Sequence, residues 1–178
     1  MIHIRELNSK DTIYLEYIQQ LIERTFPKSE YRPFEELKLL MENSNKFHVN
    51  IITENNEPVG VITYWHLVDF YFIELFAKDE SVRNKGYGTL ALQTICDKLK
   101  GPIILEIELS KTEITKRRQG FYERNHFVTW AVNYFQPPFR SEEKPIPLYL
   151  CCYGNLSPQK DFERIKRTIH SKVYKYHE

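Results

Sequence analysis

Two glycines and a pair of cationic side chains form the most distinctive chemical pattern in this sequence. Arg83 and Lys85 precede Gly86 and Gly88 in the spacing Arg-x-x-Gly-x-Gly. Where such a turn opens a helix, several backbone N–H groups point the same way with the positive end of the helix dipole behind them. The glycines let the backbone approach an anion closely, and the cations add charged donors. The turn therefore predicts a phosphate-binding site.

The same glycines also fit two other interpretations. In the first, the charged residues 78–85 form a solvated loop and the glycines only shape the start of a helix. In the second, Gly86, Gly88 and Ala91 satisfy the dinucleotide pattern G-x-G-x-x-G/A. Glu106 then stands at the distance where a ribose-binding acid is sought. The context disfavours a dinucleotide site, because a charged or polar segment separates the turn from the strand before it. The basic pair instead suits coenzyme A, which carries a 3′-phosphate as well as its diphosphate.

Residues 72–90 resemble the acetyl-CoA-binding motif of the GNAT superfamily of N-acetyltransferases. Their turn is similar to the family's Arg/Gln-x-x-Gly-x-Gly/Ala turn, and residues 121–127, Phe-Tyr-Glu-Arg-Asn-His-Phe, resemble its Tyr-Glu-Lys-x-Gly-Phe stretch. The separation of the two motifs also agrees with the family, as does the order of elements over residues 2–153. The resemblance implies an N-acetyltransferase that uses acetyl-CoA as its cosubstrate.

The resemblance also implies which residues bind the coenzyme. In the family the sheet splays beside the turn, so that pantetheine inserts like an additional strand and contacts main-chain atoms of the strand before the turn. The strand residues implied are Phe76, Ala77 and Lys78. The turn residues implied are Arg83, Asn84, Lys85, Gly86, Tyr87, Gly88 and Thr89.

Three positions depart from the family pattern. His126 replaces the usual glycine near the end of the second motif, and Arg118 replaces a small residue in the same helix. Lys78 replaces a hydrophobic residue at the end of the coenzyme strand, but a contact made through the backbone tolerates that change.

Acetylation of an amine needs two proton transfers. An amine with a reference pKa of about 10.4 is mostly protonated at neutral pH, so a base or a water-mediated exit must remove its proton before it attacks a thioester. The leaving thiol, with a reference pKa of about 8.5, departs more easily beside a hydroxyl donor. The resemblance places Tyr122 at the family's usual acid position. The other interpretation of Tyr122 is a tyrosine packed in a helix.

Three carboxylates are candidates for the base. Glu74 lies on the coenzyme strand with its side chain opposite to those of Ile73 and Leu75, and many family members keep a glutamate on this strand. Glu106 and Glu108 share one face of the strand after the coenzyme helix and could act directly or through water. Each of the three has the alternative role of a solvated or salt-bridged strand residue.

The predicted function is transfer of an acetyl group from acetyl-CoA to a small amine or a protein amino group, by direct attack in a ternary complex. The alternative is a noncatalytic coenzyme A-binding or interaction module with the same fold, and a dinucleotide-dependent oxidoreductase comes third. We expect the first two helices, Tyr64, Trp65 and the loop 136–144 to line the acceptor pocket. Aromatic residues at such positions are more often packing than recognition.

The elements that must position these residues follow from hydrophobic periodicity. Strand-like and helical patterns alternate in the order β-α-α-β-β-β-α-β-α-β-β-α, and short connections favour antiparallel pairing of the early strands. The predicted strands are 2–7, 47–53, 58–65, 70–77, 103–109, 127–135 and 147–153. The predicted helices begin near residues 11, 33, 87, 113 and 157.

We therefore predict an α/β (α+β) fold with a GNAT-like mixed, mostly antiparallel sheet of six to seven strands. Helices flank the sheet, and the resemblance implies that it splays at the coenzyme site. Residues 1–156 are expected to form the acyltransferase domain. Residues 157–178 are expected to form an amphipathic helix docked on it, with Ser157 as N-cap and Pro158 at the first helical position.

Length and composition bound these expectations. The 178 residues suit one domain, and 25 Lys and Arg against 24 Asp and Glu leave a formal net charge of +1, which provides no strong field to hold nucleic acid or an anionic membrane. No apolar run approaches the roughly 20 residues that cross a bilayer, and the first residues lack a signal pattern.

The three cysteines suit a buried core better than disulfides, and they lack zinc-ligand spacing with the six histidines. We expect a cytoplasmic enzyme without a metal, and the terminal helix or a strand edge could support a homodimer.

Overall fold

The chain folds into two compact units of mixed helix and strand. The computed structural model describes all 178 residues. The first unit comprises Met1–Trp65 and Ile73–Lys98, and the second comprises His66–Phe72 and Leu99–Glu178. Strands and α-helices follow one another in the predicted order. The predicted terminal helix belongs to the second unit, and the domain division predicted at residues 156–157 stays a prediction.

The first unit contains a four-stranded sheet and three α-helices. The strands are β1 (Ile2–Glu6), β2 (Phe47–Glu54), β3 (Glu57–His66) and β4 (Tyr71–Lys78), and the helices are α1 (Thr12–Thr25), α2 (Phe34–Asn43) and α3 (Tyr87–Lys98). The strand order is β1-β2-β3-β4, with antiparallel pairing of β1 with β2 and of β2 with β3. Two short 3-10 turns, Lys28–Glu30 and Glu80–Val82, were not predicted.

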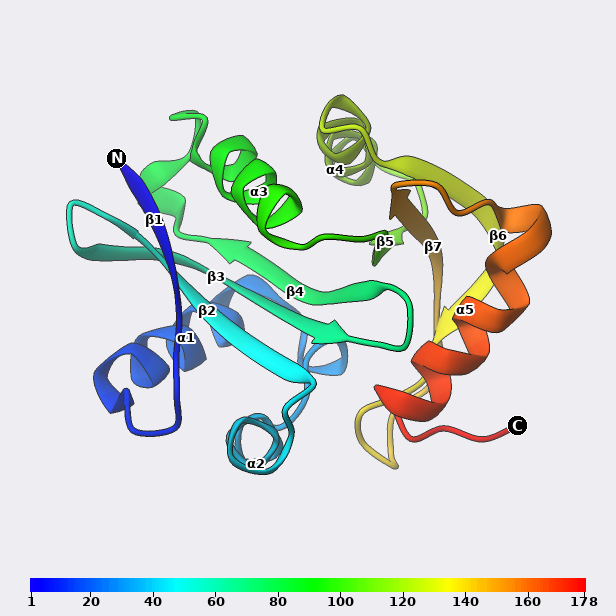
Figure 1. Cartoon of the computed structure of the whole chain (residues 1–178), viewed down its shortest axis with the longest axis horizontal. Coiled ribbons are helices and arrows are strands. Elements are labelled where there is room, and N and C mark those ends of the chain that lie inside the picture. The colour runs from blue at the N-terminus through cyan, green and yellow to red at the C-terminus, as the bar shows by residue number, and fades with distance from the viewer. The chain divides into compact units, whose positions relative to one another are not determined.

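Helices cover both faces of this sheet, because α1 and α2 lie on one face and α3 on the other (Figure 1). A strand that is covered on both faces carries a continuous apolar run rather than an alternating pattern. β3 follows this rule, since every residue from Val59 to Trp65 is buried. β3 therefore lies in the core of the first unit, beside β4, which leads into the glycine turn.

The second unit contains three strands in the order β5-β7-β6 and two helices. The strands are β5 (Ile103–Glu108), β6 (Val128–Gln136) and β7 (Ile146–Tyr153), and the helices are α4 (Glu113–Arg124) and α5 (Pro158–Lys172). β7 pairs antiparallel with β5 and β6, and the register shifts between Trp130 and Tyr134. α5 packs beside β6 (Figure 1), where His170 Nε2 lies 2.9 Å from the Phe135 carbonyl oxygen.

Several local predictions are settled by these elements. Ser157 is the N-cap of α5 and Pro158 occupies its first turn, as predicted. All three cysteines are buried and free, as expected of core residues. α2 begins at Phe34, close to the predicted start near residue 33, and Pro33 is its N-cap with ψ of 137° rather than its first helical residue. No helix has both the length and the apolar character needed to cross a membrane.

Candidate functional site

A 3-10 turn connects β4 to the glycine turn, and Asp79 fixes it. One oxygen of Asp79 accepts from the Ser81 backbone N–H at 3.0 Å, and this bond holds the pKa of the Asp79 carboxyl below its usual value. The other oxygen accepts from the Arg24 guanidinium and from the Tyr17 hydroxyl, both on α1. The carboxylate therefore ties the segment before the glycine turn to α1.

The backbone of the glycine turn is left-handed at two positions. Asn84 has φ of 63° and Gly86 has φ of 74°. Glycine adopts this conformation without steric cost, and asparagine tolerates it better than most residues. α3 begins at Tyr87, and the Leu90 N–H already donates to the Gly86 carbonyl at 3.2 Å. The N–H groups of residues 87–89 precede the helical ladder and are therefore available to an anion.

Three cationic side chains lie on this turn or beside it. Lys78 ends β4, and a Cβ atom added to Gly88 would lie 3.0 Å from the Lys78 Nζ atom, so this amine stands next to the start of α3. Arg83 exposes 66% of its side chain. The Lys85 amine lies 5.9 Å from the centre of the Tyr87 ring. Three cationic side chains therefore lie close to the open N–H groups, with the Arg83 guanidinium paired with Glu80 at 2.8 Å.

The first unit thus brings the ten predicted coenzyme residues into one continuous region. Phe76, Ala77 and Lys78 close β4, and residues 83–89 follow after the 3-10 turn. The Tyr87 hydroxyl donates to Glu54 at the end of β2, which anchors the first turn of α3 to the sheet. The coenzyme-binding role of these residues stays a prediction.

Tyr122 lies in the last turn of α4, and the end of this helix fixes its backbone. The Phe127 N–H donates to the Tyr122 carbonyl, and the His126 N–H donates to the Glu123 carbonyl, each at 3.1 Å. These bonds and the contact of the Tyr122 and Phe127 rings, with centroids 5.7 Å apart, form a Schellman C-cap. The Tyr122 hydroxyl has no hydrogen bond within the protein. Burial, and then the neighbouring Cys151, raise the pKa of this phenol.

His126 occupies the position of this C-cap at which the family pattern has glycine. Its φ of 68° lies in the left-handed region, where a side chain costs about 1 kcal/mol relative to glycine. We expect His126→Gly to raise the free energy of unfolding by about 1 kcal/mol, measured by urea denaturation. His177→Gly, near the end of the chain, is the matched control and should not raise the free energy of unfolding. An unchanged or lower denaturation midpoint for His126→Gly would show that the histidine is not strained.

Glu74 belongs to a buried ion pair in the first unit. Its two oxygens accept from Arg32 Nε at 2.9 Å and from an Arg32 terminal nitrogen at 2.5 Å, and the Trp65 indole N–H adds a bond of 3.0 Å. Only 5% of the Glu74 side chain and 6% of the Arg32 side chain are exposed. The Arg32 guanidinium also lies over the Phe47 ring at 5.7 Å. This arrangement anchors the segment before α2 to β4.

Glu106 lies on β5 and accepts hydrogen bonds from two tyrosines. The Tyr134 hydroxyl donates to one oxygen at 2.5 Å, and the Tyr174 hydroxyl donates to the other at 2.7 Å. Burial, with the negative charge of Glu106, raises the pKa of Tyr134. Glu108 on the same strand instead pairs with Arg118 at 2.5 Å, the salt-bridged role that the sequence left open.

Sequence reasoning did not identify the partners of these carboxylates. Arg32 is 42 positions from Glu74, and Tyr174 is 68 positions from Glu106, so no local pattern connects them. The anchoring role of Asp79 had a local signal, because an aspartate two residues before a serine is typical of an Asx turn.

Two residues expected to line the acceptor pocket are packed inside the first unit. Tyr64 is buried and stacks on His48 with ring centroids 4.8 Å apart. Trp65 is buried against Phe47 with ring centroids 5.0 Å apart. These contacts agree with the packing role that aromatic residues more often have. Contact with an acceptor stays a prediction.

Known N-acetyltransferases share this fold. The ribosomal-protein-S18-alanine N-acetyltransferase from Escherichia coli superposes with a TM-score of 0.61 at 18% identity, covering 86% of this chain and 93% of that chain. An aminoglycoside 6′-N-acetyltransferase in complex with coenzyme A superposes with a TM-score of 0.64 at 15% identity. The superposition covers 87% of this chain and 99% of that chain. At these identities the likeness concerns the fold alone.

Sequence similarity narrows the class to a family. Residues 14–127 match the acetyltransferase (GNAT) family. A protein from Bacteroides thetaiotaomicron, described as an acetyltransferase of the GNAT family, is 37% identical with a TM-score of 0.94, covering 98% of this chain and 99% of that chain. The chain therefore belongs to the acetyltransferase (GNAT) family, which confirms the predicted family, fold class and type of enzyme. A comparison with curated proteins gives no match.

Proposed function

We propose that the protein transfers an acetyl group from acetyl-CoA to a primary amine by direct attack in a ternary complex. One observation carries the proposal: the open N–H groups at the start of α3 lie among the cationic side chains of Lys78, Arg83 and Lys85. Family membership supports the type of reaction. The aminoglycoside N-acetyltransferase of the same fold was solved with coenzyme A, which supports the choice of cosubstrate.

Each part of the coenzyme has a proposed partner in the first unit. The backbone N–H groups of residues 84–89 bind the diphosphate, and their fixed geometry needs little reorganisation when the anion arrives. Arg83 and Lys85 add charge to the phosphates, while main-chain atoms of residues 76–78 bind pantetheine. Lys78 adds a third cation beside the start of α3, a contribution that its exposed position at the end of β4 supports.

The proposed reaction forms one C–N bond and breaks one C–S bond. The amine nitrogen attacks the acetyl carbon and loses a proton to a base, and the leaving thiolate takes a proton from the Tyr122 hydroxyl, which solvent later restores. Burial raises the pKa of Tyr122, which keeps the phenol protonated before the thiolate forms. Alignment of the two reactants supplies roughly 7 to 11 kcal/mol, more than either proton transfer.

We propose Glu106 as the base in preference to Glu74. Two partners of Glu106 are neutral phenols, and each donates a hydrogen bond to one of its oxygens. Glu74 is instead held by the permanently charged guanidinium of Arg32. This assignment makes Tyr134 and Tyr174 the residues that orient the base.

The acceptor is proposed to be a primary amine of a small molecule or of a protein. The names of proteins with the same fold include acetyltransferases of a ribosomal-protein alanine, of spermidine and of an aminoglycoside. We also propose that the enzyme acts in the cytoplasm, because its three cysteines are free and buried rather than cross-linked.

Thiol release from acetyl-CoA, measured across a panel of polyamines, amino sugars and N-terminal peptides, tests the proposal. At least one amine should accelerate release well above the rate with water alone, and the acetylated product should be detectable by mass spectrometry. Tight binding of acetyl-CoA without turnover for any amine would instead favour the noncatalytic coenzyme A-binding module.

Replacing Tyr122 with phenylalanine should slow turnover without weakening coenzyme binding. Loss of a general acid typically lowers kcat by about a hundredfold or more, whereas the ring contacts of Tyr122 survive in Tyr122→Phe. The measurements are kcat from thiol release and the Kd of acetyl-CoA from calorimetry. Tyr149→Phe on β7 is the control and should match the native enzyme. Native turnover by Tyr122→Phe would remove this tyrosine from the mechanism.

A further inference from the structure

The segment that follows α5 in the second unit folds back on the helix. We refer to residues 173–178 as the strap. Val173 is buried, and the Tyr176 N–H donates to the His170 carbonyl at 2.8 Å. Between them, the backbone of Lys175 has φ of 52°, in the left-handed region, which reverses the direction of the chain. The strap therefore stays bound to the last turn of α5.

Aromatic rings hold the second half of the strap. The Tyr176 ring lies edge-on to the rings of Phe135 and His170, with centroid distances of 5.7 and 5.6 Å. His170 is buried, and its Nε2 atom lies 2.9 Å from the Phe135 carbonyl oxygen of β6. The Tyr176 hydroxyl has no hydrogen bond within the protein, so this side chain holds the strap through its ring alone.

Tyr174 connects the strap with β5. Its hydroxyl donates to one oxygen of Glu106 at 2.7 Å, while the Tyr134 hydroxyl donates to the other at 2.5 Å. Tyr134 is buried on β6, whereas Tyr174 lies outside the sheet. The Tyr174 ring also lies 5.0 Å from that of Phe139, in the loop 136–144 that we expect to line the acceptor pocket. The strap therefore holds one oxygen of Glu106, and β6 holds the other.

Two donors on different oxygens fix the plane of a carboxylate. The terminal torsion of a glutamate side chain is broad, so a donor on only one oxygen leaves the carboxylate plane poorly defined. Hydrogen bonds donated to a carboxylate also stabilise its charged form, the form that can accept a proton. We propose that the strap positions Glu106 for proton removal, with Tyr174 as its positioning residue. This inference rests on the proposed role of Glu106 as the base.

The titration of Glu106 tests the strap without any acceptor. The protein is labelled with ¹³C in its glutamate side-chain carboxyl groups, and the Glu106 resonance is identified by its absence from Glu106→Gln. Tyr174→Phe should move the midpoint of this titration to higher pH by about half a pH unit or more, because the charged form loses a donor. An unchanged midpoint would overturn the inference.

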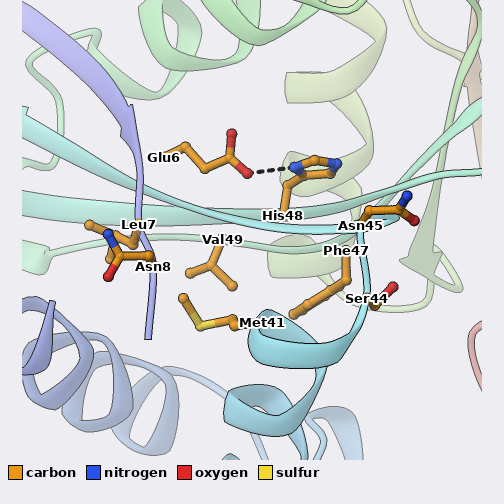
Figure 2. A pocket seen from close by; sticks show the side chains of 9 residues that line it. All are labelled: Glu6, Leu7, Asn8, Met41, Ser44, Asn45, Phe47, His48 and Val49. Atoms are coloured by element: carbon orange, nitrogen blue, oxygen red, sulfur yellow. Dashed lines mark hydrogen bonds and ion pairs between the residues drawn. The ribbon is translucent and has the colours of Figure 1, made fainter. Parts of the chain in front are cut away.

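Glu6 provides an internal reference for this experiment. Its carboxylate lies 2.6 Å from His48 Nδ1 in the first unit, with 49% of its side chain exposed, and Figure 2 shows this pair. The Glu6 resonance is identified by its absence from Glu6→Gln. Its titration should be the same in the native protein and in Tyr174→Phe, because no contact of the strap is removed there. A shift of both resonances would reveal a general disturbance and would overturn the specific role of Tyr174.

Two substitutions of Tyr176 show whether the strap acts as one element. Tyr176→Phe keeps the ring and should leave the Glu106 titration unchanged. Tyr176→Ala removes the ring contacts with Phe135 and His170 but keeps the Tyr174 hydroxyl. It should move the Glu106 midpoint in the same direction as Tyr174→Phe. A native midpoint in Tyr176→Ala would show that Tyr174 does not depend on the rest of the strap.

Turnover connects the strap with the reaction. With an accepted amine, the acidic limb of the kcat/KM profile of Tyr174→Phe should move to higher pH together with the Glu106 titration, while the Kd of acetyl-CoA stays native. A shifted titration with a native kcat/KM profile would overturn the positioning role, because Glu106 would then be held by the strap without serving as the base. If the native protein acetylates no amine, the proposed function fails, and the titration still shows whether the strap holds Glu106.

Discussion

Gly88→Val is expected to weaken acetyl-CoA binding by at least about a hundredfold, equivalent to about 2.7 kcal/mol. An added Cβ at this position already lies 3.0 Å from Lys78 Nζ, so we expect the branched valine side chain to displace the Lys78 amine and to crowd the start of α3. The proposed phosphate site would then lose a neighbouring cation and the close approach that glycine allows. The Kd of acetyl-CoA, measured by calorimetry, provides the test.

Gly120→Val is the matched control for this substitution. Gly120 also lies in a helix, but an added Cβ there meets only the flexible end of Arg124 at 3.1 Å. This control should bind acetyl-CoA with native affinity. Circular dichroism should show that Gly88→Val keeps its fold, and native affinity in that folded variant would contradict the phosphate role of the turn.

Glu74→Gln is expected to lower the free energy of unfolding by about 3–5 kcal/mol. The substitution leaves the Arg32 guanidinium buried without its carboxylate, and an uncompensated buried charge is strongly destabilising. Urea denaturation of the native and variant proteins measures the difference. A loss below about 1 kcal/mol would show that the pair is not a structural anchor.

The double variant Arg32→Met/Glu74→Leu separates the anchor role of Glu74 from the role of base. It removes both charges and keeps the volume apolar, so stability should return to within about 1–2 kcal/mol of the native protein. If Glu74 is an anchor, the double variant should still release thiol from acetyl-CoA in the presence of an accepted amine. Restored stability with no turnover would identify Glu74 as the base and would contradict the assignment of Glu106.

The sequence could predict the elements and the position of the glycine turn because both depend on local patterns. The glycines, the cations and the start of α3 lie within 78–89, and hydrophobic periodicity sets the order of strands and helices. The C-cap after α4 is also local, although the left-handed φ of His126 could be anticipated only from the family's glycine.

The environments of Glu74 and Glu106, two of the three candidate bases, could not be predicted in the same way. Alternation places Glu74 and Glu106 on a face of a strand, but it does not say which distant side chain meets that face. Arg32, which pairs with Glu74, lies in the loop before α2. Tyr174, which donates to Glu106, lies in the segment after α5. Tertiary packing therefore decides that Glu74 meets the guanidinium of Arg32 and that Glu106 meets two phenols.

We expect the bonds of Asp79 to give α1 an influence on coenzyme affinity that its own sequence does not reveal. Arg24 and Tyr17 bind the carboxylate that shapes the segment before the glycine turn, so the N–H groups that we propose as phosphate donors are held in place before any ligand arrives. Affinity gained in this manner is lost when the support is removed, even if every contacting atom remains. If the turn binds the cosubstrate as proposed, we expect substitutions at Arg24 to weaken that binding while the glycine motif stays intact.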